Sequence, residues 1–198
     1  MNVMDTATIY LPPALELKID LTDEQFFQLC QNNRDLKFER TQSGELIIMP
    51  PTGGTTGKRN SDLNFQIKAW SRQNNLGEVF DSNTGFSLPN GADRSPDVSW
   101  VRMERWEALT SEEKDKFLPL CPDFVIELRS PSDSLETLRT KMQEYINNGA
   151  RLGWLIDPKR RVVGIYRPER EVEILQSPTT VSGEDVLPGF ILDLTEIW

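Results

Sequence analysis

The sequence predicts an α/β fold built around one mixed β-sheet, and three observations lead to that prediction. Residues 123–129 form a nearly continuous apolar run, which is typical of a strand that is buried on both faces. Segments with apolar residues at helical spacing come before and after the strand region. Short strand-like runs bounded by Gly, Pro and Asn lie between them. The expected core order is a helix, three strands, a helix and a strand, with a hairpin before them.

The first part of the chain is expected to hold an arm, a short helix and a hairpin. Residues 1–21 are mixed and contain proline, which predicts an extended arm, and residues 22–198 are expected to form one domain. Thr22 is the expected N-cap of the helix, because Gln25 stands at the third helical position, as in a capping box. The hairpin strands are expected at residues 36–41 and 45–49.

A loop, a long helix and further strands are expected next. Residues 50–57 are rich in Pro and Gly and predict a loop. Leu63, Ile67 and Trp70 recur at helical spacing, which predicts a helix that ends near Asn75. Strands are expected at residues 78–81, 85–88 and 95–101, and the last of these carries Asp97.

The second half of the chain completes the predicted sheet. Residues 103–120 are polar and predict a partly helical insertion. After the buried strand, Ser132 and Asp133 are expected to cap a helix whose buried stripe runs from Leu135 to Ile146. Strands are expected at residues 152–156, 162–166 and 171–175, and residues 187–198 close the fold.

The composition excludes several kinds of active site. The chain has no histidine, which excludes Ser-His-Asp and Cys-His triads, histidine-ligated zinc and histidine general bases. Its two cysteines, Cys30 and Cys121, are too few for a disulfide framework or a Cys₄ zinc site, and this indicates a reducing cytoplasm. Any bound metal must therefore be held by oxygen atoms, which favours magnesium or manganese.

The charge and hydropathy of the chain limit its partners. No apolar stretch approaches the roughly 18 residues of a membrane helix, so no membrane partner is expected. The formal net charge of -9 argues against tight non-specific binding to nucleic acid, because phosphate neutralisation requires lysine and arginine. A local basic face is still compatible with that charge, and scattered solvated charges are the alternative. The cationic residues near the candidate site are Lys58, Arg59, Lys68, Arg72, Arg94, Arg129, Arg139 and Lys141.

Two carboxylates on apolar strands are the strongest functional signal. Asp97 opens the apolar run 98–101, and Glu127 follows the apolar run 124–126. An isolated carboxylate in an apolar strand is costly unless it is paired or binds a metal. Lys141 follows on the second predicted helix, where it borders the buried stripe. Two carboxylates with a cation close behind point to a metal site that cleaves phosphodiester bonds.

The roles of these residues depend on whether the two strands are neighbours. If they are, Asp97 and Glu127 can share one divalent ion, and the carbonyl of Leu128 can be a third oxygen ligand. Lys141 would orient or deprotonate a metal-bound water, or neutralise the phosphate. A structural alternative gives Asp97 backbone amides as partners, gives Glu127 an ion pair with a nearby cation, and leaves Lys141 at the rim of the stripe.

The motifs in combination resemble the Uma-two family. This bacterial family is assigned to restriction-type endonucleases of the PD-(D/E)XK superfamily, and it was formerly a domain of unknown function. The resemblance covers nearly the whole chain from about residue 22 onward. The segments that carry it are GELIIMPP at 44–51, SPD at 95–97, ELRSPS at 127–132, Lys141 and Tyr145, GWLIDP at 153–158 and PGF at 188–190.

The resemblance implies a restriction-endonuclease-like fold and a magnesium- or manganese-dependent endonuclease that acts on DNA. Carried over by position, Asp97 and Glu127 are the acidic metal ligands. The superfamily lysine two residues after the glutamate is Arg129 here, and arginine stays protonated, so it cannot be a general base. Lys141 would take the role of that lysine. Many members carry a histidine near the start of the first core helix, and this chain has none.

Three functional hypotheses are open from the sequence. The first is a divalent-metal-dependent DNA endonuclease, with Asp97, Glu127 and Lys141 as catalytic residues. In it, the expected substrate-binding residues are Arg129, Lys58 and Arg59. The second is a catalytically weak or inactive nuclease-fold protein with an interaction or regulatory role, and the third is a phosphoesterase acting on small nucleotides. A homodimer is also expected, since restriction-type nucleases often pair, and the hairpins at 36–49 and 161–176 offer surface for it.

Overall fold

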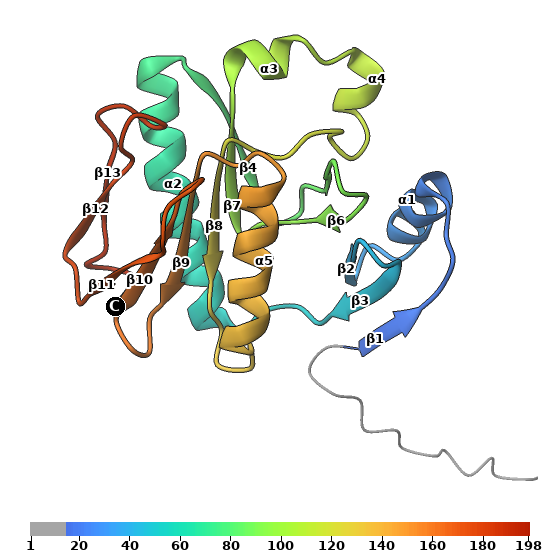
Figure 1. The fold of residues 1–198 in the computed structure, drawn as a ribbon, viewed down its shortest axis with the longest axis horizontal. Helices are drawn as coiled ribbons and strands as arrows, with labels where there is room; N and C mark the ends of the chain where they lie inside the picture. Colours follow the sequence, from blue (N-terminus) through green and yellow to red (C-terminus); the bar gives the residue numbers. More distant parts are fainter. Residues whose placement is uncertain (1–14) are drawn as a thin grey trace, which may run out of the picture.

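A computed structural model of the protein describes residues 15–198. Its centre is a six-stranded sheet with the strand order β11-β10-β9-β8-β7-β4 (Figure 1). Strands β8 and β9 are parallel, whereas β7 runs antiparallel to β8, so the sheet is mixed. The strands are β4 (Gly77–Asp81), β7 (Val98–Arg102), β8 (Phe124–Leu128), β9 (Leu152–Asp157), β10 (Val162–Tyr166) and β11 (Glu173–Gln176).

Two helices cover the two faces of this sheet. Helix α2 (Gly54–Asn74) packs on the face that carries Phe124 and Ile126, and α5 (Leu135–Asn147) packs on the face that carries Val125. Side chains alternate along β8, and all five of its residues are buried, as the apolar run predicts. The element order α2-β4-β7-β8-α5-β9 confirms the predicted α/β core of helix, three strands, helix and strand.

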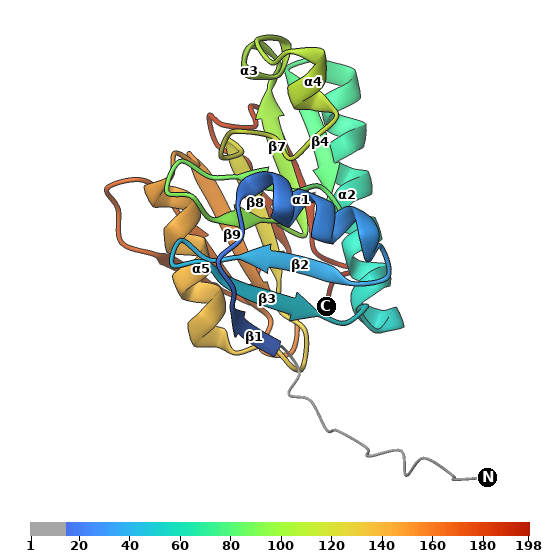
Figure 2. The ribbon, with the colours of Figure 1, turned by 90° about the vertical axis from the view of Figure 1, so that its right-hand side faces the viewer.

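A second sheet, formed mainly by the N-terminal strands, lies across the side of the molecule (Figure 2). Its strand order is β1-β3-β2-β6-β5. The predicted hairpin is confirmed, with Gly44 in the connection at a φ of 82°, a conformation that glycine adopts without strain. The strands are β1 (Leu15–Lys18), β2 (Lys37–Arg40), β3 (Glu45–Met49), β5 (Phe86–Ser87) and β6 (Asp93–Arg94).

Helix α1 (Asp23–Asn32) packs on this second sheet through Phe26, which is buried with Phe38 and Leu46. The predicted capping box is present, because the Thr22 side chain accepts from the amide of Gln25, whose side chain accepts from the amide of Thr22. The sequence therefore defines the start of this helix by its capping chemistry alone.

The remaining elements are short. The predicted polar insertion holds α3 (Met103–Glu107) and α4 (Ser111–Lys114). Strand β12 (Thr180–Ser182) pairs antiparallel with β13 (Ile191–Asp193) in a small third sheet, which the sequence does not predict. None of the helices between residues 15 and 198 combines the length and the apolar character that crossing a bilayer requires.

Three of the predicted boundaries that differ from the structure lie near the candidate residues. Helix α2 begins at Gly54, inside the predicted loop, since a helix start tolerates the glycines that the loop prediction treated as breakers. The N-cap of α5 is Ser134, because Asp133 instead accepts a hydrogen bond from the amide of Ser130. Asp97 lies just before β7, where Pro96 has no N–H group to pair with a neighbouring strand.

The predicted N-terminal arm falls largely outside the described residues. Residues 1–14 are not described, and residues 15–18 form β1, which pairs antiparallel with β3. The last third of the expected arm, from residue 15 onward, thus contains a strand of the second sheet.

Candidate active site between two sheets

Asp97 stands next to the end of β8. The register pairs Val98 with Ile126, so the residue before β7 faces the last residues of β8. One carboxylate oxygen, Oδ2, accepts the backbone N–H of Leu128 at 2.8 Å, and Oδ1 accepts the side-chain amide of Asn60 at 3.0 Å. These two bonds fix the carboxylate beside the strand that carries Glu127, which is the neighbourhood the sequence predicts for the two acids.

Glu127 points from β8 toward α5 and is only 4% exposed. Its Oε1 accepts the Tyr145 hydroxyl at 2.9 Å and lies 2.8 Å from the ammonium of Lys141. Burial raises the pKa of Glu127 to about 7, and the charges of Asp97 and Glu39 act in the same direction against the opposing effect of Lys141. Glu127 is therefore a carboxylate whose charge is poorly compensated by the protein.

Lys141 lies between two carboxylates. Its Nζ is 2.8 Å from Oε1 of Glu127 and 2.8 Å from Oε1 of Glu39. Burial by itself would lower the pKa of Lys141, but the two carboxylates outweigh burial and raise the pKa above its ordinary value. Lys141 is therefore a fixed positive charge at neutral pH, on the helix where the sequence predicts it.

Glu39 belongs to this cluster, and sequence reasoning missed it. It comes from β2 of the second sheet, is 2% exposed, and contacts Lys141 as well as the guanidinium of Arg94 at 3.2 Å. Those two cations overcome the effect of burial and lower the pKa of Glu39 to about 2. An acidic residue in a hairpin strand looks like any solvent-facing one, so no sequence signal distinguished Glu39.

The pKa values of the two buried glutamates are shifted in opposite directions because their neighbours differ. Glu39 faces two cations, Lys141 and Arg94, whereas Glu127 shares Lys141 and also faces Asp97. Arg94 in turn donates from Nε to Glu144 at 2.6 Å. The cluster thus contains four carboxylates and two cationic side chains, and fully ionised it carries a formal charge of minus two.

The predicted substrate-binding residues lie apart from this cluster. Arg129 donates from Nη1 to Asp157 at 2.7 Å, across the ends of β8 and β9. Lys58 is exposed near the start of α2 and pairs with Glu196 at 3.0 Å, and Arg59 beside it is half-buried. The interactions found within residues 15–198 include none that joins Arg129, Lys58 or Arg59 to Glu127.

The donor set fits a divalent cation that binds few protein ligands. No group of three or more His, Cys, Asp or Glu side chains between residues 15 and 198 is arranged to hold a metal. Magnesium, however, is commonly bound by one or two carboxylates together with water and substrate phosphates. Asp97 and Glu127 match that pattern. The buried Oδ1 of Asn60 is a neutral oxygen close to Asp97, and it has no hydrogen-bond partner among residues 15–198.

Other reactive groups do not compete with this site. Burial raises the pKa of the Cys30 thiol to about 11 and that of Cys121 to about 12, so neither is a thiolate at neutral pH.

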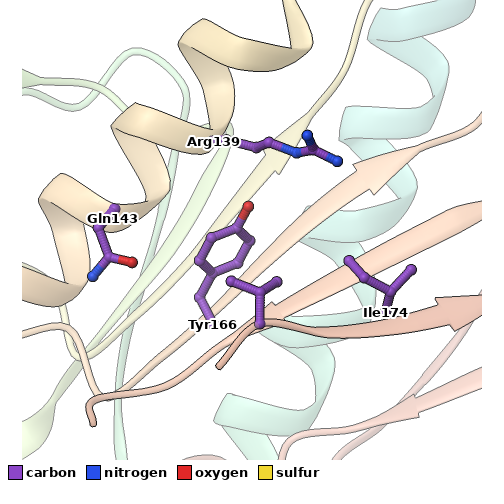
Figure 3. A pocket seen from close by; sticks show the side chains of 5 residues that line it. Arg139, Gln143, Tyr166 and Ile174 are labelled. Carbon is purple, nitrogen blue, oxygen red and sulfur yellow. The ribbon is translucent and has the colours of Figure 1, made fainter. Parts of the chain in front are cut away.

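A surface pocket of about 380 Å³ lies between α5 and the β10–β11 pair (Figure 3). Neither Asp97, Glu127 nor Lys141 lines this pocket; the residues that do are Arg139, Gln143, Tyr166, Val172 and Ile174.

Comparisons with known proteins give the family and the fold of the chain. The family model Uma2, described as "Putative restriction endonuclease", matches residues 23–195. The structure is similar to the crystal structure of a "putative nuclease belonging to DUF820" from Anabaena variabilis ATCC 29413, with a TM-score of 0.69 and 22% sequence identity. The match covers 81% of this chain and 88% of that chain. The comparison with curated proteins gave no significant match.

The structural likeness confirms the predicted restriction-endonuclease-like fold, because the similar chain is matched over most of its length. The family model spans α1, the hairpin, the central sheet and all the residues of the candidate site. The chain therefore belongs to the Uma2 family, the family that its motifs resemble.

Proposed function

We propose that the protein is a magnesium- or manganese-dependent endonuclease that hydrolyses phosphodiester bonds in DNA. The observation that carries this proposal is that Asp97, Glu127 and Lys141, which come from three separate segments, lie close together near the end of β8. Membership of a family described as "Putative restriction endonuclease" supports the same reaction class.

The charge balance of the cluster supports a divalent cation. Asp97, Glu127, Glu39 and Glu144 outnumber Lys141 and Arg94 by two, so one divalent ion would make the cluster neutral. Buried charge without compensation is costly, and here the cost falls on Glu127, whose pKa is raised to about 7. A cation shared with Asp97 would remove that cost and keep Glu127 ionised.

Each residue has a distinct proposed role. A divalent ion held by Asp97 and Glu127, with the Leu128 carbonyl as a further ligand, would supply an activated water and stabilise charge on the phosphate. The Leu128 amide orients Asp97, and the Tyr145 hydroxyl orients Glu127. Lys141 keeps its proton, so it is suited to neutralise a phosphate oxygen rather than to deprotonate water.

Substrate binding is proposed for the cations around this site. Arg129 is anchored by Asp157, and its guanidinium has further N–H donors for a phosphate oxygen. Lys58 and Arg59 stand near the start of α2, the helix that also carries Asn60. With a net charge of -9 on the whole chain, these local cations would have to attract DNA on their own, and binding would weaken steeply with salt.

The test is cleavage of plasmid DNA by the parent and by Glu127→Gln. Loss of one metal ligand removes several kcal/mol of transition-state stabilisation, so we expect cleavage to fall about a hundredfold or more. The matched control is Glu136→Gln, an exposed glutamate on α5, which should cleave like the parent. Equal cleavage by Glu127→Gln and the parent would refute the assignment.

A second candidate is a nuclease-fold protein without useful catalysis. The observation that favours it is the ion pair between Lys141 and Glu127, which gives Glu127 a cationic partner without a metal. It predicts no manganese binding at millimolar concentration, whereas metal-dependent cleavage would exclude it. A phosphoesterase for small nucleotides would be recognised by cleavage of a nucleotide ester and not of a polynucleotide.

A further inference from the structure

Glu39 reaches the candidate site from outside the central sheet. Its strand, β2, belongs to the second sheet, whereas Glu127 and Lys141 come from β8 and α5. Glu39 is only 2% exposed, and burying its charge costs desolvation energy unless strong partners compensate for it. Those partners connect Glu39 to two separate parts of the site.

The direction of the Glu39 side chain follows from the two faces of β2. Phe38 and Arg40 face α1, where Phe38 packs with Phe26 and the Arg40 guanidinium lies 5.0 Å from the centre of the Phe26 ring. Side chains alternate along a strand, so Glu39 points to the opposite face, toward α5 and Arg94. The hairpin strand is thus buried on both sides.

One oxygen of Glu39 contacts both halves of the candidate site. Oε1 lies 2.8 Å from Nζ of Lys141 and accepts the backbone N–H of Ser95 at 3.1 Å. Ser95 stands two residues before Asp97, so the same carboxylate oxygen restrains the lysine and the segment that carries the first acid. The second oxygen, Oε2, accepts from Arg94, which is tied to α5 through Glu144.

Sharing Lys141 between two carboxylates has a consequence for Glu127. The ion pair with Lys141 and the hydrogen bond from the Tyr145 hydroxyl both end on Oε1 of Glu127. The hydrogen bonds within residues 15–198 leave Oε2 of Glu127 without a donor. Without Glu39, Lys141 would have Glu127 as its one carboxylate partner in the cluster, and its ammonium would be free to move along that carboxylate toward Oε2.

We propose that Glu39 is a positioning residue of the active site, which holds Lys141 and the Ser95–Asp97 segment so that Glu127 keeps one oxygen open. This rests on the proposed nuclease function for its catalytic meaning. It also makes the second sheet an integral part of the site, since no group of the central sheet takes the place of Glu39 between Lys141 and Ser95.

The first test compares Glu39→Gln with the parent in manganese-supported DNA cleavage. Substitution of residues that orient a metal site lowers activity by roughly 10–100-fold. We therefore expect kcat to fall within that range while KM for DNA changes much less, because Glu39 is buried away from solvent. Glu45→Gln is the matched control, since Glu45 lies in the same sheet and bonds the hydroxyls of Thr41 and Ser43.

The second test does not depend on cleavage or on metal. The ammonium of Lys141 should give a protected signal in nitrogen-detected lysine NMR spectra at neutral pH, identified by its loss in Lys141→Met. We expect that signal to shift or broaden in Glu39→Gln and to stay unchanged in Glu45→Gln. If Glu39→Gln does not fold, Glu39→Asp replaces it, because the shorter side chain keeps the charge but cannot hold both partners.

The outcomes separate the two proposals. A folded Glu39 variant with the parent's kcat, or with an unchanged Lys141 signal, would overturn the positioning role. A loss of activity that only follows the fraction of unfolded protein would also overturn it. If the parent itself does not cleave DNA, the proposed function fails, and the NMR comparison alone then decides whether Glu39 positions Lys141.

Discussion

Glu127 and Glu39 show how the same residue type behaves differently a few ångströms apart. Both are buried, and both contact Lys141, yet the pKa of Glu39 is lowered to about 2 and that of Glu127 is raised to about 7. The difference lies in the second neighbour, which is Arg94 for Glu39 and Asp97 for Glu127. Glu39 is thus a stabilising charge at neutral pH, and Glu127 is a costly one.

This contrast predicts that Glu127→Gln stabilises the protein. A carboxyl with a raised folded-state pKa binds its proton more tightly in the folded than in the unfolded protein. Its contribution to stability is therefore full below about pH 4.5 and is lost as the pH rises to about 7. At pH 8 the substitution should raise the free energy of unfolding by roughly 1–3 kcal/mol, since one pKa unit corresponds to about 1.4 kcal/mol.

Urea unfolding of the parent and of Glu127→Gln between pH 4.5 and 8, without divalent ions, measures this effect. The parent should lose stability relative to the variant as the pH rises across that range. Manganese should then stabilise the parent and not the variant. A variant that is less stable than the parent at pH 8 would show that the ion pair with Lys141 outweighs the cost of burying Glu127.

Prediction from sequence works at the residue scale where a side chain contradicts its surroundings. Asp97 and Glu127 stand out because each is a carboxylate directly next to an apolar run, and Lys141 stands out because it borders a buried helical stripe. Glu39 does not differ in this way from its neighbours, since its strand has the sequence of an ordinary hairpin strand with charged residues on both sides of Phe38. The sequence pattern does not single out Asn60 either, because nothing in the sequence of α2 indicates that this amide will contact Asp97.

The elements that position the site are β8, α5 and the hairpin, and their sequence patterns are strong. Strand β8 and helix α5 are predicted by an apolar run and a helical stripe, and the hairpin by its glycine turn. Strands β6, β12 and β13 have two or three residues each, too short for a period to be recognised. Strand β6 pairs with β2 at Arg40 and Asp93, which are 53 residues apart in the sequence, and no local pattern indicates that contact.

A substitution at Gly77, at the start of β4, tests how closely β4 packs against β7. A Cβ at this position would lie 2.3 Å from the carbonyl oxygen of Val101 and 2.5 Å from the ring of Trp100, on the neighbouring strand β7. Because a backbone atom cannot yield easily, Gly77→Ala should lower the free energy of unfolding by about 2 kcal/mol or more.

The control for Gly77→Ala is Gly57→Ala in helix α2, where the nearest atom lies 4.0 Å from the added Cβ. Alanine loses less backbone entropy than glycine in a helix, so this substitution should stabilise the protein by about 0.5–1 kcal/mol. Chemical unfolding of both variants checks the pair. Two variants with equal stability would mean that β4 and β7 separate enough to admit the methyl group.

At the scale of the whole molecule, the site is built where two sheets meet. The central sheet supplies Glu127 and orients Asp97, α5 supplies Lys141, and the second sheet supplies Glu39. The sequence predicts the central α/β sheet from the order of its elements, but it does not predict that the hairpin folds back over α5. That contact rests on a few buried polar groups with no periodic pattern.

The predicted homodimer stays a prediction at this scale. Of the two hairpins expected to offer surface for it, the β10–β11 pair exposes Val172 and Ile174 at the edge of the central sheet. The other hairpin is engaged within the chain, because β2 packs against α1 and contacts α5 through Glu39. Any pairing would therefore be expected at the β11 edge.

The proposed function depends on a divalent metal that Asp97 and Glu127 hold and that drives DNA cleavage. The most direct test is calorimetric titration of manganese into the parent and into Asp97→Asn, with a plasmid-cleavage assay on the same samples. We expect the parent to bind manganese and cleave the plasmid, and we expect Asp97→Asn to do neither while staying folded. A parent that binds no manganese at millimolar concentration would contradict the claim and leave Asp97 and Glu127 as structural hydrogen-bonding partners.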